Sequence, residues 1–230
     1  MSTLLELVER RLEVVQALAA NQCGGSYGDA CILISSLISG MAAHLWPGRY
    51  IDQKRFVEIW ARYADPGQLA NSVSVPLLTQ SLRAKERIAE AGMLEARQDQ
   101  MFGPGYSVRV LSGVEVDLAE SDVLQTCPGL ALRDVRRYSY GAVFYEDVRS
   151  ALVHEYQLTN QASAWPMTRK EAGISYVNYG SGDDASDMER RIHYHIPWLL
   201  GLVRSIARSV EPVWATGPIA RPARWWVSGG

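Results

Sequence analysis

An arginine, a serine, a histidine and a tyrosine follow one another at helical spacing in the stretch from Tyr140 to Tyr156. Arg149 and Ser150 are adjacent, His154 follows after four intervening residues, and Tyr156 lies two residues further on. A histidine titrates near neutral pH and can remove or deliver a proton. A guanidinium binds a phosphate through two parallel hydrogen bonds and stabilises charge that develops on its oxygens. This combination is suited to cleaving a phosphate ester without a metal ion.

The helical positions of these groups limit how they can cooperate. At about 100° per residue, a helix brings four side chains within roughly 80° of one another as an apolar stripe: Tyr145, Val148, Leu152 and Tyr156. Arg149 falls in or beside this stripe, and His154 lies about 140° round from Arg149. One straight helix therefore does not aim both groups at one point. Two copies of the helix meeting across a dimer axis would, or the helix must end or distort near His154.

The pattern Arg-x4-His-x-Tyr over residues 149–156, on a helix of a mostly helical chain, resembles the HEPN family (higher eukaryotes and prokaryotes nucleotide-binding domains). The resemblance implies an all-α, antiparallel helical bundle with small β additions, acting as a homodimer. It also implies a metal-independent endoribonuclease without a cofactor, in which each copy supplies Arg149 and His154 to a cleft between them. The ribose 2′-hydroxyl would be the nucleophile, leaving a 2′,3′-cyclic phosphate and a 5′-hydroxyl.

Other residues have supporting roles in this interpretation. Ser150 would hydrogen-bond the substrate or hold a neighbouring group, and Glu146 lies one turn before Arg149. Arginines are the usual contacts to backbone phosphate, and the local candidates are Arg133, Arg136 and Arg137.

Tyr156 has a further implication through the family. Some small HEPN toxins with this pattern pair with a nucleotidyltransferase antitoxin that attaches AMP to the corresponding tyrosine. The resemblance thus makes Tyr156 a candidate AMPylation position and suggests a toxin–antitoxin or defence setting. This chain is much longer than those toxins.

A purely structural explanation of the same residues stays open. Arg149 could pair with Glu146 or with a carboxylate on a neighbouring helix, His154 could terminate the helix, and Tyr156 could be a core residue. The alternative function is a non-catalytic HEPN-like module that binds a nucleotide or a partner protein through the same interface.

Composition and charge restrict the class of protein. The 230 residues suffice for one well-buried core, and 47% hydrophobic with 21% charged residues is ordinary for a soluble globular protein. The net charge of −2 provides no general basic field, so any RNA contact must be local. The N-terminus lacks a signal sequence and no run is long enough to span a membrane, so we expect a cytoplasmic protein.

No metal site is expected from the remaining motifs. Cys23, Cys31 and Cys127 have no metal or disulfide spacing and are expected to be buried thiols. His193 and His195 are expected on different faces of a helix, and the glycine-rich residues 24–28 are expected to form a turn.

The order of elements follows from apolar periodicity and capping residues. We expect helices over 2–20, 29–45, 52–63 with Asp52 as cap, 74–92 ending at Gly92, and 133–156 with an interruption near 139–141. Residues 98–128 form an inserted elaboration with a hairpin turning at 112–113, and a strand covers 174–179. A capping box at Ser186 opens a last helix through 210, kinked at Pro197. A single helical domain spans 1–211, and a proline- and tryptophan-containing tail follows at 212–230.

Overall fold

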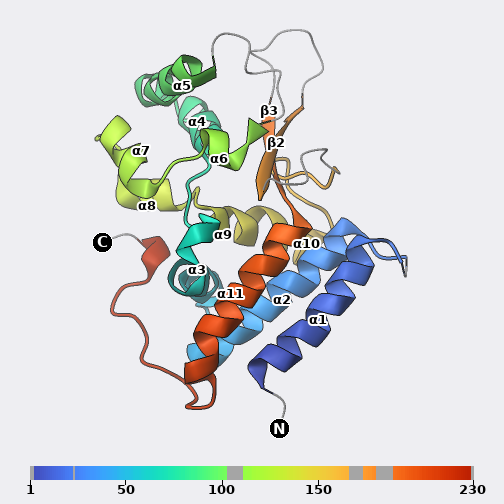
Figure 1. Cartoon of the computed structure of the whole chain (residues 1–230). Helices are drawn as coiled ribbons and strands as arrows, with labels where there is room; N and C mark the ends of the chain where they lie inside the picture. The colour runs from blue at the N-terminus through green and yellow to red at the C-terminus, as the bar shows by residue number, and fades with distance from the viewer. Residues whose placement is uncertain (1–2, 23, 103–110, 166–172, 180–188, 229–230) are drawn as a thin grey trace.

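The computed structural model describes the chain except residues 1–2, 23, 103–110, 166–172, 180–188 and 229–230 (Figure 1). The described part is mostly helical with one small sheet, which confirms the expected mostly-α class. It divides into a layer of long helices, shown from blue to red in the lower half of Figure 1, and a second layer of shorter helices beside the sheet.

Helix α2 (Tyr27–Leu45) is the central element of the long-helix layer. It packs against α1 (Leu4–Ala19), α3 (Asp52–Tyr63) and α11 (Ile196–Trp214). Its Ile34, Ile38 and Leu45 are fully buried, as expected for a helix that is apolar on more than one side. Capping boxes start α1 at Thr3 and α2 at Ser26.

Among the described residues, α2 is the one helix long and apolar enough to cross a membrane by length and composition, so the expectation that no run is long enough is corrected. Its buried residues belong to the core shared with α1, α3 and α11. The central position of α2 in a helical core therefore explains its length and its apolar composition.

Three sequence expectations in the first half of the chain are corrected. Asp52 is the first residue of α3 rather than its cap, which is Ile51. The helix expected over 74–92 is two helices, α4 (Val75–Ala84) and α5 (Ile88–Phe102). They are separated by Glu86 in a left-handed conformation with φ 58°, and Gly92 lies inside α5. A helix cannot continue through a left-handed residue, so the break occurs there.

The hairpin expected around residues 112–113 is replaced by a long-range pairing. Strand β1 (Leu111–Ser112) pairs with β2 (Ile174–Tyr179), and α6 (Gly113–Val116) begins where the turn was expected. The chain continues through α7 (Glu120–Thr126) and α8 (Leu132–Arg136). Residues 103–110 of the expected hairpin lie outside the described residues.

The sheet is antiparallel in the order β1-β2-β3, with β3 at Glu189–Tyr194. The strand expected over 174–179 is confirmed as β2. The helix expected from 186 is wrong over 189–194, because Ile192 and Tyr194 alternate inward and pair with β2. Helix α11 starts at Ile196, and Pro197 sits in its first turn, where a proline is tolerated and causes no kink. Ser186 lies outside the described residues.

Helix α11 continues through Pro212 to Trp214, so the tail expected from residue 212 begins after Trp214. The tail docks on the body of the same chain. It leaves the end of α11 and runs back to α3 and α8 (Figure 1), ending in the 3₁₀ turn η5 (Trp226–Ser228). The Trp226 N–H donates to the carboxylate of Glu58, a fully buried residue of α3. The Trp225 ring meets Trp46 edge-on at 5.8 Å.

The stretch that carries the sequence motif is one continuous helix over residues 140–155, called the motif helix below. It consists of α9 (Tyr140–Val143), the π-helical segment η3 (Phe144–Ser150) and α10 (Ala151–Glu155). The expected interruption before it is confirmed, since α8 ends at Arg136 and Ser139 is extended. Gly141 allows close packing on α3, because a Cβ there would lie 2.8 Å from Cγ of Trp60.

We predict that Gly141→Ala lowers the free energy of unfolding by about 1–3 kcal/mol, since the added methyl group overpacks the contact with Trp60. Gly92→Ala is the matched control: a Cβ at this helical glycine meets no atom within 4 Å, so it should be neutral or stabilise by about 0.5–1 kcal/mol. Urea denaturation measures both. Equal effects of the two substitutions would contradict the close packing.

Candidate functional site

The winding of the motif helix is wider than α-helical over residues 144–150. Such π segments are rare, and they occur frequently at functional sites. The helix ends at Tyr156, whose backbone is left-handed with φ 55°. Arg149 therefore lies in an irregular segment, and His154 lies in the last turn before a defined stop.

Arg149 is held against an aromatic ring rather than by an acid. Its guanidinium carbon lies 4.9 Å from the centre of the Tyr145 ring, and Nη1 donates to the Tyr145 hydroxyl at 3.3 Å. Among the described residues it forms no ion pair, with Glu146 or with any other carboxylate. The side chain is half-buried. The charge of Arg149 is thus available to a ligand.

His154 is exposed to solvent and forms no hydrogen bond with any described residue. Its imidazole is accessible but is not oriented by a neighbour. No hydrogen bond or ring contact joins Arg149 and His154 within the part of the chain that is described. The two side chains differ in exposure, since Arg149 is half-buried and His154 is exposed.

The residues with supporting roles, Glu146, Ser150 and Tyr156, are exposed or half-buried. Glu146 is exposed, and Ser150 is half-buried with no hydrogen bond from its side chain to a described residue. Tyr156 is 73% exposed, so the interpretation of this residue as part of the core is wrong. Its hydroxyl donates to Asp29 at 2.8 Å. Asp29 also belongs to the capping box of α2, so this bond fastens the end of the motif helix to the start of α2.

The three upstream arginines have different environments. Arg136 pairs with Glu120, lies 4.5 Å from the centre of the Trp226 ring and donates to the Trp226 carbonyl. These contacts hold the tail and leave Arg136 less free for RNA. Arg133 and Arg137 are exposed. The charge of Arg137 favours ionisation of Asp147, although burial dominates and raises the pKa of that carboxyl.

A buried hydrogen-bonded cluster that sequence reasoning missed fixes the start of the motif helix. Asp117 accepts hydrogen bonds from the hydroxyls of Tyr140 at 2.5 Å and Tyr176 at 2.6 Å, and from the Val75 N–H at 3.0 Å. Burial raises the pKa of Asp117 to about 7, although all three donors lower it. The carboxyl joins the motif helix, β2 and α4. Neither residue spacing nor periodicity indicates such a cluster, because its members are distant in sequence.

Two histidines near the end of β3 correct another expectation. His193 lies in β3 and His195 is the extended residue before α11, so they do not lie on different faces of a helix, and their ring centres are 4.9 Å apart. Nε2 of His195 lies 2.8 Å from the Ser175 hydroxyl, and Nδ1 of His193 lies 2.8 Å from the Ser163 carbonyl oxygen. Burial lowers the pKa of both, that of His195 to about 4. They are satisfied core histidines.

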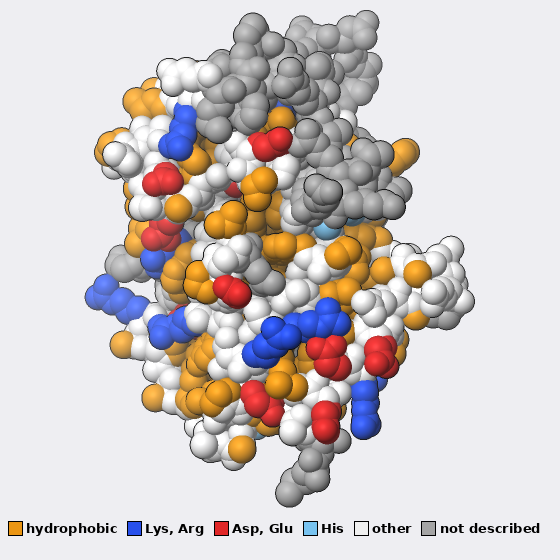
Figure 2. All heavy atoms as spheres, in the orientation of Figure 1, with side chains coloured by type: hydrophobic (Ala, Val, Ile, Leu, Met, Phe, Trp, Pro, Cys, Tyr) orange, Lys and Arg blue, Asp and Glu red, His pale blue; other side chains and the backbone are white. Residues whose placement is uncertain are grey.

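No group of three metal-ligating side chains occurs within the described ranges. Cys31 and Cys127 are buried free thiols, as expected, and Cys23 lies outside the described residues. On the face shown in Figure 2, lysines and arginines are interspersed with acids, so any RNA contact on this face must be local.

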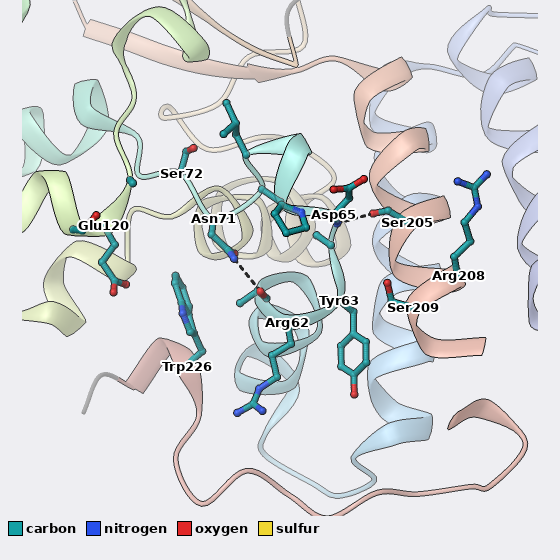
Figure 3. A pocket seen from close by; sticks show the side chains of 17 residues that line it. Arg62, Tyr63, Asp65, Asn71, Ser72, Glu120, Ser205, Arg208, Ser209 and Trp226 are labelled. Atoms are coloured by element: carbon teal, nitrogen blue, oxygen red, sulfur yellow. Dashed lines mark hydrogen bonds between the residues drawn. The ribbon is translucent and has the colours of Figure 1, made fainter. Parts of the chain in front are cut away.

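A surface hollow of about 800 Å³ lies between the end of α3, α11, α7 and the tail (Figure 3). Asn71 and Ser205 are engaged by the protein itself, through the Ala61 carbonyl and the Asp65 N–H. The side chains of Arg62 and Arg208 extend in different directions. The hollow contains none of the motif residues, and its charged groups do not converge on one point.

Searches against protein-family models, curated proteins and solved structures gave no match to this chain.

The Asp117 cluster yields a pH-dependent prediction. The folded-state pKa is raised to about 7 from 3.8, so the folded protein binds more protons than the unfolded chain between these values. The stability contribution of Asp117 is therefore lost as pH rises through this window. Tyr140→Phe removes a donor that favours the ionised form, so we predict a cost of about 1–3 kcal/mol, larger at pH 8.5 than at pH 5.

Tyr194→Phe is the matched control for this substitution. The Tyr194 hydroxyl donates to the Tyr140 backbone carbonyl at 2.9 Å, an acceptor that does not titrate. Its loss should cost the same at both pH values, as measured by urea denaturation. A Tyr140→Phe cost that does not change with pH would show that Asp117 does not ionise in this range.

Proposed function

We propose that the protein is a metal-independent endoribonuclease whose active site combines Arg149 and His154 at the interface of a homodimer. The observation that best supports this proposal is the environment of the Arg149 guanidinium. Its guanidinium is half-buried against Tyr145 without an ion pair to any described carboxylate. A purely structural arginine in such a place would be expected to have an acidic partner, because a charge taken out of water without one is costly.

Each group has a defined chemical role in this proposal. Arg149 binds the scissile phosphate and stabilises the charge that grows on its non-bridging oxygens. His154, which is exposed to solvent, takes the proton of the ribose 2′-hydroxyl, and solvent water protonates the departing 5′-oxygen. The 2′-oxygen bonds to phosphorus as the bond to the 5′-oxygen breaks, so the products are a 2′,3′-cyclic phosphate and a 5′-hydroxyl. Ser150 hydrogen-bonds the substrate, and the exposed Arg133 and Arg137 contact neighbouring phosphates.

The dimer is part of the proposal because no hydrogen bond or ring contact joins Arg149 and His154 of one chain among the described residues. Arg149 lies against the body of its own chain, while His154 points into solvent one turn further on. A twofold axis beside the motif helix would place His154 of one copy by Arg149 of the other. Closed twofold dimers are the commonest oligomers.

The HEPN resemblance and its setting belong to the same proposal. The exposed phenol of Tyr156 is accessible to an enzyme that transfers AMP, in keeping with a toxin restrained by a nucleotidyltransferase partner in the cytoplasm. One observation favours the alternative, a module that binds nucleotide or protein without cleaving RNA. His154 has no described neighbour that orients its ring, whereas a catalytic histidine usually does.

We predict that Arg149→Ala and His154→Ala each lower RNA cleavage in EDTA by about 100-fold or more. Both variants should remain folded dimers, because Arg149 is only half-buried and His154 is exposed. Arg11→Ala, an exposed arginine of α1, is the control and should cleave like wild type.

Mixing the two inactive variants tests the composite site. Equal amounts of Arg149→Ala and His154→Ala, allowed to exchange subunits, should recover about a quarter of wild-type activity, because half the dimers are mixed and each contains one intact site. No recovery, with exchange demonstrated, would place Arg149 and His154 of one site in the same chain. Wild-type activity in both single variants would exclude the motif helix as the active site.

A further inference from the structure

The loop between α2 and α3 presents an aromatic side chain to solvent. Tyr50 is 94% exposed, and its backbone is left-handed with φ 61°. A bulky residue rarely adopts this conformation, which costs about 1 kcal/mol or more; such residues cluster at functional sites and also end helices, as Tyr156 does here. The Tyr50 hydroxyl forms no hydrogen bond with a described residue. Nothing in that part of the chain therefore explains why a tyrosine occupies this place.

Two guanidinium groups hold the loop in this shape. Nη1 of Arg55 donates to the carbonyls of Trp46 at 3.4 Å and Gly48 at 3.3 Å, and Arg221 of the tail donates to the carbonyl of Pro47. Gly48 has φ 152°, and a Cβ there would lie 2.2 Å from Nη2 of Arg221. These hydrogen bonds join the loop to both α3 and the tail. They hold the backbone in the conformation that exposes Tyr50.

Positive charge gathers at the same loop. Exposed Arg49 and Lys54 have no ion pair among the described residues, and Arg221 adds a third cation. Arg55 is a fourth, paired with Asp52. In a chain of net charge −2, this is a local surplus of cations beside an exposed ring. Unpaired bases are bound by aromatic stacking, and the nucleic-acid backbone is bound by basic groups.

The loop adjoins the proposed active site. Phe56 of α3 packs on the Tyr145 ring, with the two ring centres 5.2 Å apart, and the guanidinium carbon of Arg149 lies 4.9 Å from the centre of the same Tyr145 ring. Arg149 and α3 therefore meet at one phenol ring. Tyr50 lies two residues before the first residue of α3. A strand bound at Arg149 can continue over the loop.

We propose that the loop at residues 47–50, with Lys54, binds single-stranded RNA beside the cleavage site. One unpaired base stacks on Tyr50, and the flanking phosphates contact Arg49 and Lys54. This inference rests on the proposed function, because the RNA is the substrate of the Arg149 site. It names single-stranded rather than duplex RNA, since a base within a duplex has no free face for the ring.

The test measures binding without cleavage. The probe is a fluorescein-labelled 2′-O-methyl oligoribonucleotide of about 12 nucleotides, which has no free 2′-hydroxyl, and the readout is fluorescence anisotropy with the full chain. Tyr50→Ala should weaken binding about tenfold, and Tyr50→Phe should bind like wild type because the ring face is kept. Arg49→Ala and Lys54→Ala should each reduce the slope of log affinity against log salt by about 0.7.

Arg11→Ala on α1 is the matched control and should leave affinity and salt slope unchanged. Wild-type affinity in Tyr50→Ala, or no binding by wild type at about 50 mM salt, would overturn the inference. An equally strong preference for the same sequence as a duplex would also overturn it. Tyr50-dependent binding without cleavage of ordinary RNA would support the loop and contradict the nuclease. Cleavage of ordinary RNA, together with binding that does not depend on Tyr50, would support the nuclease and contradict RNA binding by the loop.

Discussion

The position of the motif helix depends on the hydrogen bonds that the Asp117 carboxyl accepts. This carboxyl collects donors from the start of that helix, from β2 and from the first turn of α4. Gly113 leaves room for the Tyr140 hydroxyl beside Asp117, since a Cβ at residue 113 would lie 2.4 Å from that hydroxyl. A carboxyl taken out of water is stable only when its oxygens are satisfied, so the three elements must meet in one arrangement.

Both ends of the motif helix are fixed to the rest of the chain. Asp117 holds the start, and the bond from Tyr156 to Asp29 holds the end. Between them, the π segment carries Arg149 against the Tyr145 ring, and that ring packs on Phe56 of α3. The sheet, the central helix α2 and the helix pair α3–α11 thus form a rigid support. The groups proposed to contact RNA have few bonds to this support, as expected for side chains whose partner is a ligand.

Apolar periodicity sufficed to predict the helices α1, α2 and α3, and the strand β2 was also predicted, although the capping residue expected for α3 was wrong. Local signals failed for residues 189–194, where Ile192 fits both a helical seam and an inward-facing strand position. Pairing with β2 decided between them, and that pairing is long-range. The break at Glu86 escaped detection because a glutamate carries no signal for a left-handed conformation.

The candidate site was predictable only in part. Residue types and spacing indicated Arg149 and His154. Helical geometry indicated that one straight helix would not aim both groups at one point, so that either a dimer or a distortion of the helix was required. The π segment has no residue-type signature, and the Asp117 cluster joins residues 23 and 59 positions apart. The HEPN family assignment stays a prediction, because the mostly helical class is common to many folds.

The proposed metal-independent cleavage, with the ribose 2′-oxygen as the nucleophile, can be tested by identifying the chemical ends that the protein leaves on RNA. Purified protein would be incubated with a single-stranded RNA in EDTA, and the fragments analysed by mass spectrometry and by labelling with polynucleotide kinase. The account predicts 2′,3′-cyclic phosphates and 5′-hydroxyls, because the 2′-oxygen is the nucleophile. Fragments with 3′-hydroxyl and 5′-phosphate ends would contradict it, since they require water as the nucleophile. Intact RNA would contradict it too, and would favour the binding module.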